Sequence, residues 1–315
     1  MPASYVHQWL ATRAWRQLGQ DAPPAPLLAG AEGPDPFFYY RLLVPAANRP
    51  ISALGGRLHS ERTADFLMAL LARAGGADDD ARAYALGFLT HYAADTTVHP
   101  YVYAHAFDRA GCYRSNLHCG LEAAMDTWAY HGEGGRGIPR QMQGVAALSP
   151  AQCDGIAAVL TGAVGEAFPE DAPGEAVTRR SFADAVSICR LLHSPSGIKY
   201  HLFATLGAWA GQPGLVEAHA LSRRLPGGDF GNLARQGWCS PWAPDALRRE
   251  SLPELYDAAV TRACALLRAA QALWARALSE ADMRALLGDQ QYDSGLPWQT
   301  SGKLTDGNPP PPAMP

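Results

Sequence analysis

Apolar residues recur three and four positions apart through most of the chain, which is the spacing of amphipathic helices rather than of strands. The pattern predicts helices at Ser4–Leu18, Ser60–Ala74, Asp79–Tyr103, Asn116–Tyr130, Pro150–Phe168, Arg179–Leu192, Lys199–Ala210, Leu252–Leu278 and Ser279–Leu287. Alternating runs of Val, Ile, Thr and Tyr are scarce, and no Asn-Gly hairpin turn occurs. We therefore predict an all-α fold, a helical bundle.

The capping residues and loops between these predicted helices indicate a single domain. Serines that favour N-caps stand at Ser4, Ser60, Ser149 and Ser279, and Pro253 suits the first turn of a helix. Glycine- and proline-rich loops are expected at Asp21–Pro36, Ala46–Gly56, Gly132–Pro139 and Gly211–Gly214. No linker divides the helical region, so we expect one domain over residues 1–299 and a disordered proline-rich tail over residues 300–315.

Composition narrows the class of protein. Hydrophobic residues make up 48% and charged residues 18%, which is typical of a globular chain, and the formal net charge is -4. A chain with this net charge lacks the excess of basic residues that holds nucleic acid, so we expect no stable nucleic acid partner. No apolar run is long enough for a transmembrane helix, and no signal peptide pattern is found, so we expect a cytoplasmic protein. The six cysteines form no C-x-x-C pair and are expected to be buried thiols.

The stretch from Gly87 to Tyr101 carries the strongest chemical signal. His91, Asp95 and His99 are spaced four residues apart, and each such step turns a helix by about 400°, so the drift is only about 40° per step. The three side chains therefore share one stripe of one helix. Histidine and aspartate are common ligands of zinc and iron.

A second stripe follows on the next predicted helix. His118 and Glu122 stand one turn apart, and Asp126 lies one turn further. Packing the two helices together would bring three histidines and at least two carboxylates around one cavity, which favours a metal site. An ion-paired core is the alternative, and Arg109 or Arg114 in the connecting loop are its candidate partners.

Three upstream residues are further ligand candidates: His7 in the first helix, Asp35 in a Gly/Pro loop, and His59 just before a helix. Each alone has an ordinary structural explanation, as a helix-surface histidine, a turn aspartate or a helix-end histidine. Phe37, Phe38, Tyr39 and Tyr40 follow the aspartate and are a candidate apolar or cation-binding wall.

The order of these motifs resembles that of the bacterial zinc-dependent phospholipase C family, which is related to the S1/P1 nucleases. The resemblance rests on His7-x-Trp9, Gly30-Ala-x-x-Pro-Asp35, Leu58-His59, His91-x3-Asp95-x3-His99-Pro-Tyr and His118-x3-Glu122. It implies an all-α fold that holds a cluster of two or three zinc ions. Weaker similarity extends to Ser251–Ala259 and Tyr292–Pro297.

The resemblance also implies a ligand set. One zinc would take Asp35, His59, His91 and Asp95. A second would take His99, His118 and Glu122. A third would take His7, with Asp95 bridging. Secreted members complete the third site with an N-terminal tryptophan, whereas this sequence begins Met1-Pro2, and removal of Met1 would expose the Pro2 amine as a substitute.

The implied activity is phospholipase C-like hydrolysis of a phosphodiester, on a small-molecule or lipid substrate, by metal-activated water. Asp35 is both a candidate ligand and the candidate catalytic base. The family's choline-pocket acid precedes the first-helix histidine, and no acid precedes His7 here, so choline specificity is not expected. Two alternatives stay open: an S1/P1-like nuclease or nucleotidase, and a di-iron oxygen-dependent enzyme. The second is disfavoured because no Glu-x-x-His pair occurs.

Overall fold

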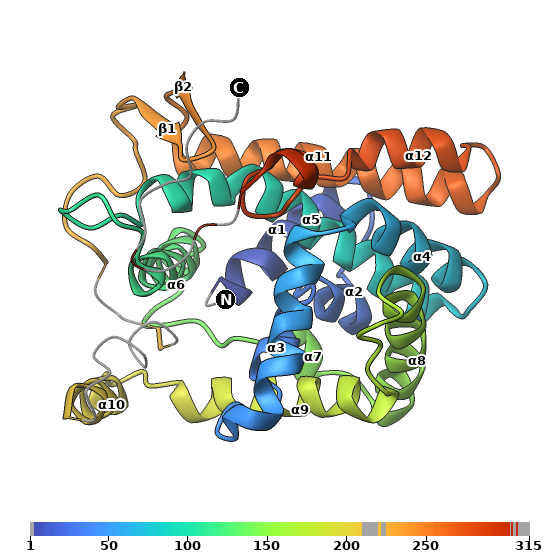
Figure 1. The fold of residues 1–315 in the computed structure, drawn as a ribbon, viewed down its shortest axis with the longest axis horizontal. Coiled ribbons are helices and arrows are strands. Elements are labelled where there is room, and N and C mark those ends of the chain that lie inside the picture. Colours follow the sequence, from blue (N-terminus) through green and yellow to red (C-terminus); the bar gives the residue numbers. More distant parts are fainter. Residues whose placement is uncertain (1–2, 210–219, 222–224, 303, 305–306, 308–315) are drawn as a thin grey trace.

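A computed structural model describes residues 3–209, 220–221, 225–302, 304 and 307 of the chain (Figure 1). The α-helices are α1 (Ser4–Gln17), α2 (Ala25–Gly30), α3 (Pro45–Ser60), α4 (Thr63–Gly75), α5 (Asp79–Ala104), α6 (Ser115–Gly132), α7 (Gln143–Ala146), α8 (Pro150–Ala167), α9 (Glu175–Leu192), α10 (Ile198–Trp209), α11 (Leu252–Trp274) and α12 (Glu280–Leu287). Short 3-10 helices are η1 (Asp35–Tyr39) and η2 (Trp298–Thr300). The predicted all-α fold is confirmed.

The small strands β1 (Trp238–Ser240) and β2 (Ala243–Arg248) form one antiparallel hairpin at the end of the molecule where α11 begins (Figure 1). Its register pairs Trp238 with Arg248 and Cys239 with Leu247. Among the described residues, no helix combines the length and the apolar character that a bilayer crossing requires.

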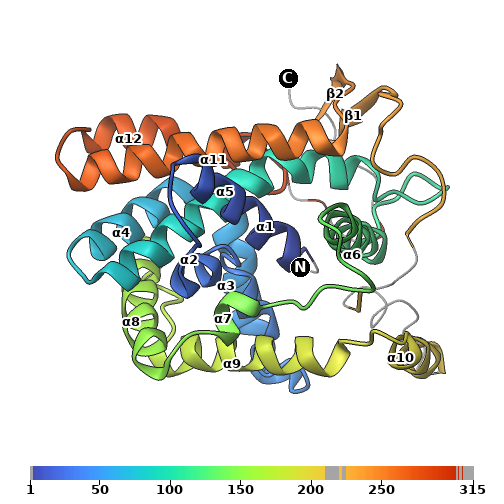
Figure 2. The same cartoon turned by 180° about the vertical axis from the view of Figure 1, so that it is seen from behind.

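Helix α5 lies at the centre of the fold. It packs against α11 and α2, and also against α1, α4 and α8 (Figures 1 and 2). Phe88, Leu89 and Tyr92 on α5 are fully buried in a core that continues into α1, α4, α8 and α11. Asp78 caps the helix by accepting the Ala81 N–H at 2.8 Å. Two further acids in the first turn of α5 favour the positive end of the helix dipole.

Two glycines let α2 and α5 approach closely. A Cβ on Gly30 would lie 2.0 Å from the Tyr84 carbonyl oxygen, and one on Gly87 would lie 1.9 Å from the Leu27 carbonyl oxygen. Neither position accommodates a side chain without moving the helices apart. This contact brings the Ala31 carbonyl at the end of α2 beside His91 of α5.

Several predicted helices have nearly the observed bounds. The segments predicted as Ser4–Leu18, Asp79–Tyr103, Asn116–Tyr130 and Pro150–Phe168 correspond to α1, α5, α6 and α8. Ser149 and Ser279 cap α8 and α12, and Pro253 lies in the first turn of α11. The helix predicted at Leu252–Leu278 ends at Trp274, because Ala275 leaves the helical conformation.

The loop predictions for Asp21–Pro36 and Ala46–Gly56 were wrong. The first contains α2 and the start of η1, and the second lies inside α3. Pro45 occupies the first turn of α3, where its missing N–H costs little, and Pro50 is tolerated inside the helix. The cap predictions at Ser4 and Ser60 were also wrong, because Ser4 is already helical and Ser60 ends α3.

Some predictions lie wholly or partly outside the described residues. These are the Gly211–Gly214 loop, most of the 300–315 tail, the end of the helix predicted at Lys199–Ala210, and the Pro2 amine. The single domain over residues 1–299 stays a prediction.

Candidate metal centre

The two helical stripes meet around shared carboxylates. On α5, His91 Nε2 lies 3.0 Å from Asp95 Oδ2 and His99 Nε2 lies 3.5 Å from Asp95 Oδ1. On α6, His118 Nε2 lies 3.3 Å from Glu122 Oε1. His99 Nε2 is also 3.1 Å from that same Glu122 oxygen. His99 therefore connects the α5 stripe to the α6 stripe.

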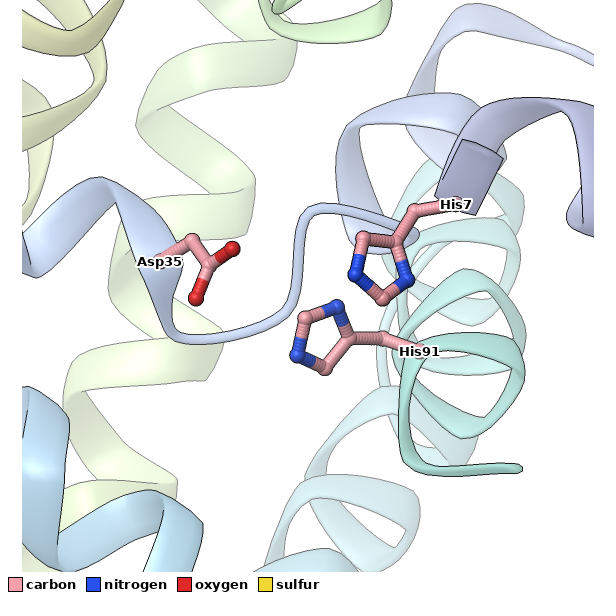
Figure 3. A group of neighbouring side chains, drawn as sticks. All are labelled: His7, Asp35 and His91. Atoms are coloured by element: carbon pink, nitrogen blue, oxygen red, sulfur yellow. The ribbon is translucent and has the colours of Figure 1, made fainter. Parts of the chain in front are cut away.

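Helix α1 brings His7 to the other side of Asp95. His7 Nε2 lies 3.4 Å from Asp95 Oδ1, and its ring stacks on the His91 ring with centroids 4.2 Å apart. Figure 3 shows these two rings facing one another, with the Asp35 carboxylate across from them. Asp126 anchors the start of α1, since its carboxylate accepts the Val6 N–H at 2.8 Å. Because Asp126 is one turn beyond Glu122, α6 both supplies a site residue and positions His7.

Asp35 and His59 complete the cluster. Asp35 begins η1, and its Oδ1 lies 3.2 Å from His59 Nε2. His59 Nε2 is also 3.9 Å from Asp95 Oδ2. The sequence placed His59 before a helix, whereas it lies in the last turn of α3, where Nδ1 donates to the Gly55 carbonyl at 2.7 Å. That bond fixes the ring so that Nε2 faces the carboxylates.

These side chains surround a cavity of about 220 Å³. Seven of the predicted metal-site residues line it: His7, Asp35, His59, Asp95, His99, His118 and Glu122. The other lining residues are Phe38, Gly56, Tyr103 and Asp293. Phe38 belongs to the aromatic wall expected after Asp35. His91 lies behind the lining and contacts Asp95 from within the protein. The structure thus brings all eight predicted metal-site residues together.

Asp293 is the residue that sequence reasoning missed. It lies in the loop after α12, and its Oδ1 is 3.8 Å from His99 Nδ1. Its segment was noted only as weakly similar to relatives, and a lone acid in a Gly/Pro-rich loop is usually a turn residue. No local spacing signal could have placed it at the cavity.

Burial and mutual contact set the charges of the cluster. Burial raises the pKa of Asp35, but the hydrogen bond from His59 and the nearby His91 outweigh it and hold the pKa at about 2. Burial opposes ionisation of Asp95 and Glu122 as well, yet the histidines around them keep both pKa values below the ordinary range. The three carboxylates are therefore anionic at neutral pH and attract cations.

Burial and neighbouring charges shift the pKa values of His7 and His99 in opposite directions. Burial, together with His91, lowers the pKa of His7 to about 3, so His7 is neutral and has a free lone pair. Burial disfavours protonation of His99 too, but Asp95 and Glu122 raise its pKa to about 9. A neutral histidine among carboxylates is the form that binds metals.

Unpaired polar atoms in the interior fit a metal ion. Among the described residues, His7 Nδ1 and His118 Nδ1 are buried and make no hydrogen bond. Leaving such atoms without partners costs about 1–3 kcal/mol each. Three groups of potential ligands have donor atoms within 4.8 Å of one another: His7, Asp35 and His91; His59, His91 and Asp95; and His99, His118 and Glu122. Imidazole and carboxylate donors suit zinc.

The alternative of an ion-paired core can be compared with the contacts of Asp95 and of Arg114 in the connecting loop. Arg114 Nε lies 2.7 Å from Asp108 Oδ2 in the same loop. The ion pairs of Asp95 in the described chain are with His7, His59, His91 and His99. Within the described residues, Asp95 is thus paired with histidines and not with an arginine, which was the pairing that the alternative required.

Comparison with known proteins gives one match. The family model described as zinc dependent phospholipase C matches residues 6–153, which include α1 through the start of α8 and all eight predicted metal-site residues. No curated protein and no solved structure matches. The matched family is the one that the motif order indicated, and its members are zinc-dependent. Over residues 6–153, the chain is thus similar to the zinc-dependent phospholipase C family, and this match supports a family assignment.

Proposed function

We propose that the chain is a zinc-dependent phosphodiesterase of the phospholipase C type. The family match and the three ligand groups support a metal-dependent, phospholipase-like hydrolase. The observation that carries the proposal is the convergence of five histidines and three carboxylates on one buried centre beside a cavity. A structural zinc site is usually closed by four protein ligands, whereas a catalytic site keeps one position open to water or substrate, and the cavity beside this cluster provides that space.

The candidate ligands divide into two well-populated sites. His99, His118 and Glu122 would hold one zinc, and Asp35, His59, His91 and Asp95 would hold another. His7 with Asp95 would contribute to a third. When bound, the metal polarises the phosphoryl oxygens and acidifies a bound water.

The chain's own residues prepare the cavity for hydrolysis. Asp35 keeps its negative charge because the histidines around it hold its pKa at about 2, so its carboxylate can orient a water molecule and accept a proton. The carbonyls of Gly55 and Ala31 fix the His59 and His91 rings by accepting their Nδ1–H groups. A rigid donor set of this kind requires no rearrangement as negative charge develops on the substrate.

Cavity size bears on the substrate. About 220 Å³ is below the usual volume of a drug-sized ligand pocket, roughly 300–1,000 Å³. It accommodates a phosphoester headgroup but not acyl chains, so a lipid substrate would insert only its phosphate. Phe38 and Tyr103 form aromatic parts of the wall beside the carboxylates.

The test is hydrolysis of vesicles that contain phosphatidylcholine, phosphatidylethanolamine and phosphatidylglycerol by zinc-loaded protein, with diacylglycerol and the phosphorylated headgroups measured as products. Asp35→Asn should remove the activity, whereas Asp257→Asn, on the exposed face of α11, should keep it. Zinc content measured on the same samples separates the loss of a base from the loss of a ligand. Cleavage of single-stranded DNA with intact lipid would contradict the proposal and favour the nuclease alternative.

A further inference from the structure

The loop that follows α12 is anchored directly on the metal centre, although it lies outside the matched residues 6–153. The Tyr292 N–H donates to the His59 carbonyl at 2.8 Å. The buried Tyr292 ring packs against the rings of His59 and His91, with centroids 5.1 and 5.8 Å apart. The loop is thus fixed to α3 and α5 at two site histidines.

A second anchor lies one turn along α5. Pro100 has no N–H to offer the Thr96 carbonyl, which would be its partner in a regular helix. Gly295 packs at this point, where a Cβ would lie 2.4 Å from the Thr96 oxygen. Its φ of +66° further favours glycine. Asp293 lies between the two anchors, so its backbone is positioned on both sides.

Between these anchors, Asp293 faces the outer nitrogen of His99. His99 Nε2 is directed at Glu122 and Asp95, at 3.1 and 3.5 Å, and His99 Nδ1 lies 3.8 Å from Asp293 Oδ1. This nitrogen is buried and makes no hydrogen bond in the described chain. The Tyr103 hydroxyl hydrogen-bonds with Asp293 and holds it at the edge of the cavity. The Asp293 side chain is 19% exposed, so the carboxylate is partly buried and retains limited contact with water.

Two other site histidines show what a partner at Nδ1 does. His59 donates Nδ1–H to the Gly55 carbonyl at 2.7 Å and His91 donates to the Ala31 carbonyl at 3.0 Å. In both, Nε2 then faces the carboxylates. Histidines that bind metals through one nitrogen commonly donate the other N–H to a carbonyl or carboxylate, which fixes the ring and strengthens its basicity. In the described residues, His99 Nδ1 makes no hydrogen bond to a carbonyl, and the Asp293 carboxylate lies 3.8 Å from it.

We propose that Asp293 is a positioning residue for the metal centre, which orients His99 by accepting its Nδ1–H and so directs Nε2 toward the metal. The proposal rests on the proposed function, because it assigns His99 as a zinc ligand. The segment after α12, which lies outside the matched residues 6–153, would thus contribute a residue to the site. A carboxylate serves better than a carbonyl here, because its charge also favours the cation held on the far side of the ring.

The experiment compares zinc affinity in the full chain, by competition with a chromophoric chelator. Asp293→Asn keeps the size of the side chain but removes its charge. It should lower the affinity for the zinc that His99 would hold by about 10- to 100-fold. Long-range ¹H–¹⁵N spectra of the zinc-loaded wild type should show His99 protonated at Nδ1 and protected from exchange. That protection should be lost in Asp293→Ala, which has no acceptor, whereas a purely structural role of Asp293 would leave the His99 Nδ1–H protected.

Asp289→Asn is the matched control. Asp289 lies in the same loop and holds it in place, accepting from Trp298 Nε1 at 2.7 Å and from the Ala64 N–H at 2.9 Å, but it does not line the cavity. It should lower thermal stability while leaving zinc affinity close to wild type. Equal losses of affinity in the two variants, or unchanged affinity in Asp293→Asn, would overturn the inference. A wild type that binds no zinc would instead refute the proposed function.

Discussion

Glu32 offers a quantitative test of the interior, because its carboxyl is fully buried beside the candidate metal centre. Oε1 accepts from Ser4 Oγ at 2.7 Å and from Gln8 Nε2 at 2.5 Å, while Oε2 makes no hydrogen bond among the described residues. Burial raises the pKa of Glu32 from 4.5 to about 8, although these two hydrogen bonds oppose the rise. The folded protein therefore keeps this proton at neutral pH, whereas the unfolded chain releases it.

A raised pKa in the folded state fixes the sign of the effect on stability. Below pH 4.5 both states hold the proton, and the contribution of Glu32 to stability is fully present. As the pH rises toward 8, the free energy of unfolding falls by about 1.4 kcal/mol per pH unit from this group. Glu32→Gln keeps the acceptor oxygen but exchanges no proton. From about pH 5.5 to about pH 7.5, the variant should therefore gain about 2.7 kcal/mol relative to wild type.

Urea unfolding at several pH values, followed by circular dichroism, measures this difference. A chelator removes metal from all samples, so that zinc binding does not add to the stability of the folded state. Glu280→Gln is the matched control, because this glutamate is exposed at the start of α12, and its stability curve should stay parallel to that of the wild type. If Glu32→Gln also runs parallel to wild type, the reasoning that burial keeps Glu32 protonated is refuted.

Three further predictions concern the residues that build the centre. Asp126→Ala removes the acceptor for the first N–H groups of α1 and should lower stability by at least about 1 kcal/mol, measured by urea unfolding. Gly33→Ala would place a Cβ 2.3 Å from the His91 ring at a φ of +53°, and should cost about 1–3 kcal/mol, measured as a lower Tm. His99→Ala and His118→Ala should each lose at least one zinc per chain in elemental analysis, and unchanged zinc in both would contradict the two-helix site.

The site residues on α5 and α6 could be predicted because their spacing within a single helix determines which side chains share a face. His91, Asp95 and His99 share one stripe whenever that segment is helical, and the strong cap and buried face of α5 make it so. His118 and Glu122 follow the same rule on α6. That these two stripes face each other is a tertiary fact, which the residue types suggested but the spacing alone did not determine.

The parts that were missed depend on packing between distant segments. Helix α3 contains Pro45, Pro50, Gly55 and Gly56, a composition typical of loops, and it is helical in spite of this local preference. His59 was therefore assigned to the wrong helix end. Asp293 reaches His99 only because the loop after α12 is anchored on α3 and α5. No period in the sequence connects residues so far apart.

The most direct test of the account is elemental analysis of the full chain, purified without a metal-affinity column and dialysed against metal-free buffer. The account predicts two or three zinc ions per chain, held by the groups of His99, His118 and Glu122 and of His59, His91 and Asp95. Iron in place of zinc would favour the oxygen-dependent alternative. A chain that binds no zinc even after reconstitution would contradict the central claim, and the buried cluster would then be an ion-paired core.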